Sequence, residues 1–209
     1  MLADAGIRVV CDLRSGVERE QLTFTWPGTA TPDVLVRDCE PTGGVADLGR
    51  VIDGIERGTD GGVRQHMLDQ YHALPAVLSP IMRAFVDALL AGGVPALLHC
   101  AAGKDRTGFA SAMLLSALGS PRSVIEAEYL RSNDHVNAAR IRSIVEAHTG
   151  RRIAWRTAAG MTCRPEYLEA AMTAAAHAHG SLDGYLEEEL GLTPARRQEL
   201  QRLLLEAGA

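Results

Sequence analysis

The chemistry of this chain is concentrated in one short segment, HCAAGKDRTG, which runs from His99 to Gly108. Its cysteine, Cys100, is followed after five residues by Arg106 and then by Thr107. The segment follows an apolar run and precedes a predicted helix, so its backbone N–H groups and the helix N-terminus can surround an oxyanion. A thiol in such a loop is expected to ionise readily, because helix N-termini and nearby cations lower the pKa of cysteine. The segment therefore predicts an anion-binding loop with a nucleophilic cysteine.

The other residues of the loop suit a phosphate group. The planar guanidinium of Arg106 can bind two phosphate oxygens, and Gly103 lets the backbone approach the anion closely. Thr107 can donate its hydroxyl to the thiolate. Lys104 is the only lysine in the chain. It either adds a second positive charge for the phosphate or a phosphoinositide headgroup, or it is an exposed loop residue without a role. The predicted phosphate-binding residues are Ala101, Ala102, Gly103, Lys104, Arg106 and Thr107.

The spacing of the cysteine, arginine and threonine resembles the signature loop of the cysteine-dependent phosphatases. Within them, HCAAGKDRTG is similar to the loop of the bacterial tyrosine and lipid phosphatases. Four further segments resemble that family: DLRS at 12–15 followed by Glu18, YLRSN at 129–133, RPEYL at 164–168 and GSLDGYL at 180–186. The resemblance implies hydrolysis of phosphate monoesters through a phosphocysteine, on phosphotyrosine-bearing proteins, phosphoinositides or both, with no metal or cofactor. It also implies lid helices within 63–90 and 150–190, and that the family's N-terminal strand is missing before DLRS.

The catalytic roles of individual residues follow from this reaction. Cys100 is expected to attack phosphorus, and Arg106 to stabilise the charge of the transition state. A carboxyl group must protonate the leaving oxygen, and the resemblance favours Asp105 or Asp12. Asp105 lies in the loop. Its alternative role is structural, as a carboxylate that ties the loop to neighbouring backbone.

Asp12 ends a predicted strand, at the edge of the sheet where α/β folds bind ligands. Its alternative role is structural, in an ion pair with Arg14 or Arg131.

Two rival functions remain at this point. A rhodanese-type sulfurtransferase also uses a loop cysteine before a helix, although the arginine–threonine pair disfavours it. A phosphate-binding pseudophosphatase would keep the loop without turnover. The net charge of −5 argues against a general nucleic-acid binder. The four cysteines, at 11, 39, 100 and 163, have no metal-site spacing.

No signal peptide and no apolar run of about 18 residues is evident, so we expect no integral membrane segment and a cytoplasmic protein. The oligomeric state and the physiological substrate stay open.

The pattern of elements predicts one α/β phosphatase domain over 1–209, with a small, mostly parallel central sheet flanked by helices and a helix-rich C-terminal half. The predicted strands are 7–13, 34–37 and 94–99. The predicted helices are 45–57, 65–91 with a break near Leu74-Pro75, 107–118, 121–130 capped by Ser120, 134–148, 165–179, 181–190 and 194–207.

Basic residues are concentrated in one part of this acidic chain. Residues 131–164 hold seven arginines against Asp134 and Glu146, a local balance of +5. Such a stretch either steers anionic substrates toward the site or is a solvated helix face.

Overall fold

Three short parallel strands form the sheet of the computed structural model, which describes residues 4–23, 25–27, 31–39, 52–54 and 61–205. The strands are β1 (Val9–Asp12), β2 (Asp33–Val36) and β3 (Ala96–His99), in the order β2-β1-β3. All four residues of β1 are buried, as expected of a central strand in a parallel sheet. The register places the last residue of β1 opposite the last residues of both neighbours. The carboxyl ends of the strands therefore meet at one edge, and the loop at Cys100 starts from it.

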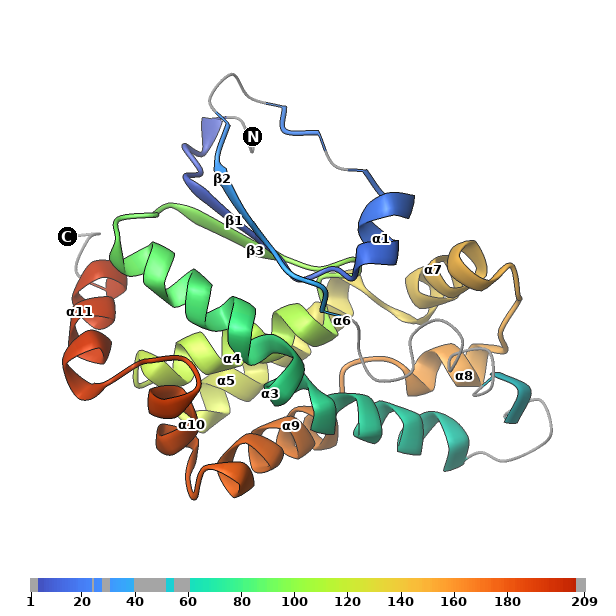
Figure 1. Cartoon of the computed structure of the whole chain (residues 1–209). Helices are drawn as coiled ribbons and strands as arrows, with labels where there is room; N and C mark the ends of the chain where they lie inside the picture. Colours follow the sequence, from blue (N-terminus) through green and yellow to red (C-terminus); the bar gives the residue numbers. More distant parts are fainter. Residues whose placement is uncertain (1–3, 24, 28–30, 40–51, 55–60, 206–209) are drawn as a thin grey trace.

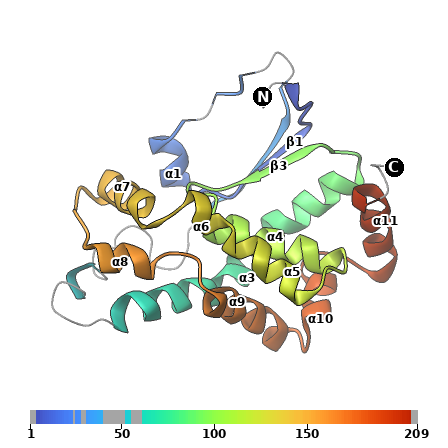
Figure 2. The same cartoon turned by 180° about the vertical axis from the view of Figure 1, so that it is seen from behind.

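Helices make up most of the rest of the chain, and most of them lie on one side of the sheet (Figures 1 and 2). Helices α3 and α4 contact the strands, and α9 packs along α3. The small parallel sheet with a helix-rich second half confirms the predicted α/β class. Residues 52–54 are helical. The longer helices are α1 (Gly16–Gln21), α3 (Gly61–Leu90), α4 (Asp105–Ala117), α5 (Arg122–Leu130), α6 (Ser132–His135), α7 (Ala138–Thr149), α8 (Trp155–Gly160), α9 (Pro165–Ala178), α10 (Leu182–Glu188) and α11 (Pro194–Leu205).

Helix α3 is the central helix, and it is continuous over 30 residues although it contains Pro75 and Pro80. The predicted break near Leu74-Pro75 is therefore wrong. A proline inside a helix costs about 3 kcal/mol, whereas each large apolar side chain that is buried contributes about 2 kcal/mol. Several such side chains of α3 are buried on both sides of the prolines, among them Met67 before them and Phe85 after them. Packing of the whole helix thus outweighs the local preference of proline.

The same helix bears on the question of membrane segments. Within the described residues, the stretch Gly62–Leu90 is long and apolar enough to cross a membrane by length and composition. Half of its most apolar window is buried inside the protein, and the helix packs on α9 and the sheet. Its apolar character is accounted for by its place in the core.

Most of the remaining differences from the predicted elements concern helices. The predicted helix 134–148 is divided into α6 and α7, because the side chain of Asn137 accepts hydrogen bonds from two N–H groups and caps a new helix. Ser120 does not cap α5; its N-cap is Pro121, without a side-chain hydrogen bond. Helices α1 and α8 were not predicted. Most of the predicted helix 45–57 falls outside the described residues.

Candidate active site

The loop between β3 and α4 turns around the thiol of Cys100. This residue follows the last residue of β3 directly, and only 8% of its surface is exposed. The backbone N–H of Gly103 donates a hydrogen bond to the Cys100 sulfur over 3.2 Å. Gly103 has a φ of +67°, in the left-handed region that favours glycine. The loop can therefore close over the sulfur and reach the start of α4 at Asp105 within a few residues.

Arg106 is buried, and one edge of its guanidinium is bound to protein. Its Nη1 donates to the carbonyl of Leu13 over 2.8 Å and to Oε2 of Glu18 over 2.6 Å, and its Nη2 donates to Oε1 of Glu18 over 2.6 Å. A guanidinium has five N–H donors in a fixed plane. The Nε–H and the second Nη2 hydrogen make up the other edge, and Nε has no partner among the described residues.

The charge of Arg106 is held firmly. Burial acts to lower the pKa of this guanidinium, but the hydrogen bonds that it donates to Glu18 and the nearby Cys100 sulfur outweigh burial and raise the pKa. The side chain is therefore a permanent cation beside the thiol.

Glu18 is a functional candidate that the sequence analysis named only as part of the DLRS resemblance and gave no role. It is the third residue of α1, and it forms a capping box with Ser15: its N–H donates to the Ser15 hydroxyl, and the Ser15 N–H donates to its carboxylate. The same carboxylate forms the ion pair with Arg106, and only 15% of the Glu18 side chain is exposed. The signal in the sequence was a serine followed three residues later by glutamate, the pattern of a helix N-terminus.

Asp12 lies at the end of β1, but its carboxylate is bound by Arg14. Nε of Arg14 donates to Oδ1 over 2.8 Å, and Nη2 donates to Oδ2 over 2.6 Å. Burial acts to raise the pKa of Asp12, but the hydrogen bonds from the side chain and backbone of Arg14 outweigh it, so the pKa lies below its ordinary value. This is the ion pair given above as the alternative for Asp12. Arg131 instead pairs with Glu128 over 2.9 Å.

Asp105 begins α4, and both of its hydrogen bonds reach the same oxygen. The Tyr71 hydroxyl and the Lys104 ammonium each donate to Oδ1 over 2.6 Å. Oδ2 has no partner among the described residues. The Asp105 side chain is 34% exposed. The carboxyl group is thus oriented through one oxygen, while the other is available to a bound molecule.

Lys104 is buried rather than exposed. Only 4% of its side chain is accessible, and its ammonium bridges Asp105 and the carbonyl of Met161, which it reaches over 2.6 Å. Met161 is the C-cap residue that follows α8. Lys104 therefore joins the loop to α8 in addition to any electrostatic effect on a bound phosphate.

Tyr71 was not singled out in the sequence, and it joins Asp105 to a second buried phenol. Its hydroxyl lies 2.7 Å from that of Tyr129. Burial raises the pKa of both tyrosines, so both hydroxyls stay protonated. Tyr71 can therefore act as a constant donor to Asp105.

The predicted hydrogen bond from Thr107 to Cys100 is wrong. The Thr107 hydroxyl is buried without a hydrogen-bond partner, and the Gly103 N–H is the donor to the sulfur. The described residues also contain no group of three or more histidine, cysteine, aspartate and glutamate side chains that could hold a metal ion.

A pocket of about 200 Å³ opens beside Asp105 and Arg106. Its walls come from α3, which lies in the predicted lid range 63–90, from Met161 in the range 150–190, and from α7, which neither range includes. The lining side chains, apart from those of the loop, are mostly apolar: Met67, Leu74, Ile141, Ile144, Val145 and Met161, with His66, Gln70 and Tyr71. The pocket therefore offers an apolar space next to a cation and a carboxyl group.

Comparisons with known proteins agree with this geometry. The model of a family described as "Tyrosine phosphatase family" matches residues 1–206. The Triple specificity protein phosphatase PtpB of Mycobacterium tuberculosis is 39% identical over 154 residues, which are 68% of this chain and 55% of that protein. A protein of Cupriavidus necator named "Putative tyrosine-protein phosphatase" is 36% identical over 131 residues, 62% of this chain and 47% of that protein.

The chain thus spans about half the length of the curated relatives it matches. The family model covers nearly all of the chain, including the loop, α1 and the helices around the pocket. The chain belongs to the tyrosine phosphatase family.

Proposed function

We propose that this chain hydrolyses phosphate monoesters through a phosphocysteine intermediate. The observation that carries the proposal is the arrangement of Arg106. One edge of its guanidinium is bound by Glu18 and Leu13. The other edge carries two parallel N–H donors, and the Cys100 sulfur is near enough to raise the pKa of the guanidinium. Two parallel N–H groups match two oxygens of a phosphate.

The reaction has two steps. The Cys100 thiolate attacks phosphorus, an S–P bond forms, and the bond from phosphorus to the ester oxygen breaks while a carboxylic acid gives its proton to that oxygen. Water then attacks the phosphocysteine and gives a proton to the same carboxylate. The S–P bond breaks, and inorganic phosphate and the thiolate are released.

Of the two carboxyl groups named above, Asp105 suits the general acid. A general acid must carry a proton at the working pH and must reach the leaving oxygen. Both oxygens of Asp12 are bound by Arg14, and its pKa is lowered. Oδ2 of Asp105 faces no described partner, and the residue lines the pocket.

The pocket favours phosphotyrosine as the substrate group. Its walls beyond the loop are mostly apolar and suit an aryl ring. A phosphoinositide with several phosphates would need several cations. Of the lysine and arginine residues lining the pocket, only Arg106 can face the ligand, because the Lys104 ammonium is already bound by Asp105 and Met161.

The test is a panel of phosphotyrosine peptides, phosphoserine peptides, phosphoinositides and an aryl phosphate, with Cys100→Ser as the control. We expect turnover of the aryl and phosphotyrosine substrates, loss of turnover in C100S, and a phosphorylated Cys100 in mass spectrometry after an acid quench. Phosphate binding without turnover in the wild type would favour the pseudophosphatase. Transfer of sulfur from thiosulfate to cyanide would favour the sulfurtransferase, and faster turnover of phosphoinositides would overturn the choice of phosphotyrosine.

A further inference from the structure

The loop before α8 and the first turn of that helix form a surface that the proposed reaction does not use. We call it the Trp155 face and define it by Arg151, Arg152, Trp155 and Arg156. It lies in the most basic part of the chain: residues 135–164 hold six arginines and one acidic residue, a net charge of +5. Since the chain as a whole carries −5, the remaining residues carry −10. Positive charge is therefore concentrated in this segment of the sequence.

Trp155 projects from this surface. It is 59% exposed, whereas Ile153 and Thr157 on either side of it are buried. The buried neighbours fix the direction of the backbone, so the indole is held outward rather than free to fold onto the core. An exposed indole is unfavourable in water, and tryptophan is the residue type enriched where proteins meet the membrane–water interface.

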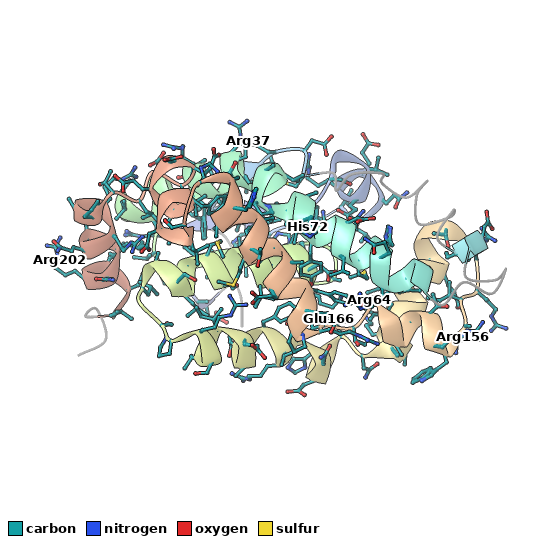
Figure 3. All side chains as sticks on the ribbon, turned by 90° about the horizontal axis from the view of Figure 1, so that it is seen from below. Arg37, Arg64, His72, Arg156, Glu166 and Arg202 are labelled. Carbon is teal, nitrogen blue, oxygen red and sulfur yellow. The ribbon has the colours of Figure 1, made fainter. Side chains whose placement is uncertain are left out.

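Three arginines flank Trp155 in the chain. The side chain of Arg152 is 87% exposed, and its contact with Glu146 is loose at 3.7 Å. Arg156 is exposed and lies at one end of the molecule, away from the pair of Arg64 and Glu166 (Figure 3). Arg151 forms a closer pair with Asp53 over 2.6 Å. The two arginines nearest Trp155 in the chain whose side chains are exposed are thus Arg152 and Arg156.

We propose that the Trp155 face docks on an anionic lipid bilayer. Charge complementarity selects the orientation, because the acidic remainder of the protein is repelled by the same surface. The indole enters the headgroup region while the arginines bind the headgroups. Met161, the C-cap of helix α8, lines the pocket and accepts the hydrogen bond of Lys104, so docking holds the pocket close to the bilayer.

The test is co-sedimentation of the full chain with phosphatidylcholine vesicles, with and without phosphatidylserine. We expect binding only to the anionic vesicles and release by high salt. Each basic residue at an anionic surface contributes about a fivefold factor in affinity, so R152Q/R156Q should weaken binding about 25-fold. W155A should weaken it about tenfold. All variants should hydrolyse a soluble aryl phosphate at the wild-type rate, which keeps docking separate from catalysis.

Two controls make the result specific. Arg202, on α11, lies at the end of the molecule opposite Arg156 (Figure 3), and R202Q should bind like the wild type. The chain has two tryptophans, so a blue shift of fluorescence on anionic vesicles should persist in W26F and disappear in W155F.

Equal losses in R202Q and R152Q, or no binding to anionic vesicles, would overturn the proposal. So would equal binding of soluble glycerophosphoserine, or binding of an acidic polypeptide in place of vesicles.

Discussion

Replacing Glu18 by glutamine tests how the structure prepares Arg106 for catalysis. The carboxylate of Glu18 accepts two hydrogen bonds from Arg106, each of 2.6 Å, and it also completes the capping box of α1. Glutamine at the same helix position supports a capping box as well. The substitution therefore removes the charge opposite Arg106 and spares the start of the helix.

The size of the effect follows from the bonds that change. A hydrogen bond to a charged group contributes about 1.5–3 kcal/mol, and a neutral one about 1 kcal/mol. Glutamine keeps one acceptor and turns an N–H group toward the guanidinium, so about 2 kcal/mol of orienting energy is lost. If the transition state depends on this orientation, kcat/KM falls about 30-fold.

The assay is kcat/KM on an aryl phosphate, under conditions where urea unfolding shows that the variant is folded. Ser15→Ala is the matched control, because it removes the hydroxyl of the capping box and leaves the Glu18 carboxylate on Arg106. It should cost about 1 kcal/mol of stability and leave kcat/KM within about threefold of the wild type. Wild-type turnover in E18Q, or an equal loss in S15A, would refute the idea that Glu18 acts by orienting Arg106.

Three further predictions concern the carboxyl groups and the lysine. Asp105→Asn should lower turnover of phosphotyrosine about 100-fold and that of a p-nitrophenyl ester much less, because a good leaving group needs no proton; equal losses on both esters would remove Asp105 as the acid. Asp12→Asn leaves the buried Arg14 unpaired and should cost about 3 kcal/mol at neutral pH. Because the pKa of Asp12 is lowered in the folded state, the stabilisation by the ion pair is fully present above the ordinary aspartate pKa. It is lost as the pH falls from that value through the lowered pKa of the folded state. Urea unfolding at several pH values should show that the difference in free energy of unfolding between the variant and the wild type becomes smaller in acid. A difference independent of pH would contradict the ion pair. Lys104→Arg should lower both stability and turnover, because the ammonium fills a nearly closed space between Asp105 and Met161 and a guanidinium is larger. Wild-type stability and turnover in this variant would mean that the site does not require a lysine.

The sequence was informative where the signal is local. The loop at Cys100 needs only a strand end, a glycine with positive φ and a helix start, and all three are read within ten residues. Glu18 and Tyr71 were missed because their contacts with the loop span 88 and 34 positions of the chain. The break assigned to Leu74-Pro75 failed for a related reason: a local proline rule was overruled by burial that depends on the whole core.

The loop makes few contacts of its own, and its shape depends on three elements around it. Arg106 is held by α1 through Glu18, Asp105 by α3 through Tyr71, and Lys104 by the end of α8. These contacts come from three different elements, and each fixes a different group: the guanidinium of Arg106, the carboxyl group of Asp105 and the ammonium of Lys104. A catalytic constellation keeps its geometry only when the surrounding residues hold it. The long-range contacts that sequence patterns do not reveal are therefore the ones that make the loop a site rather than a turn.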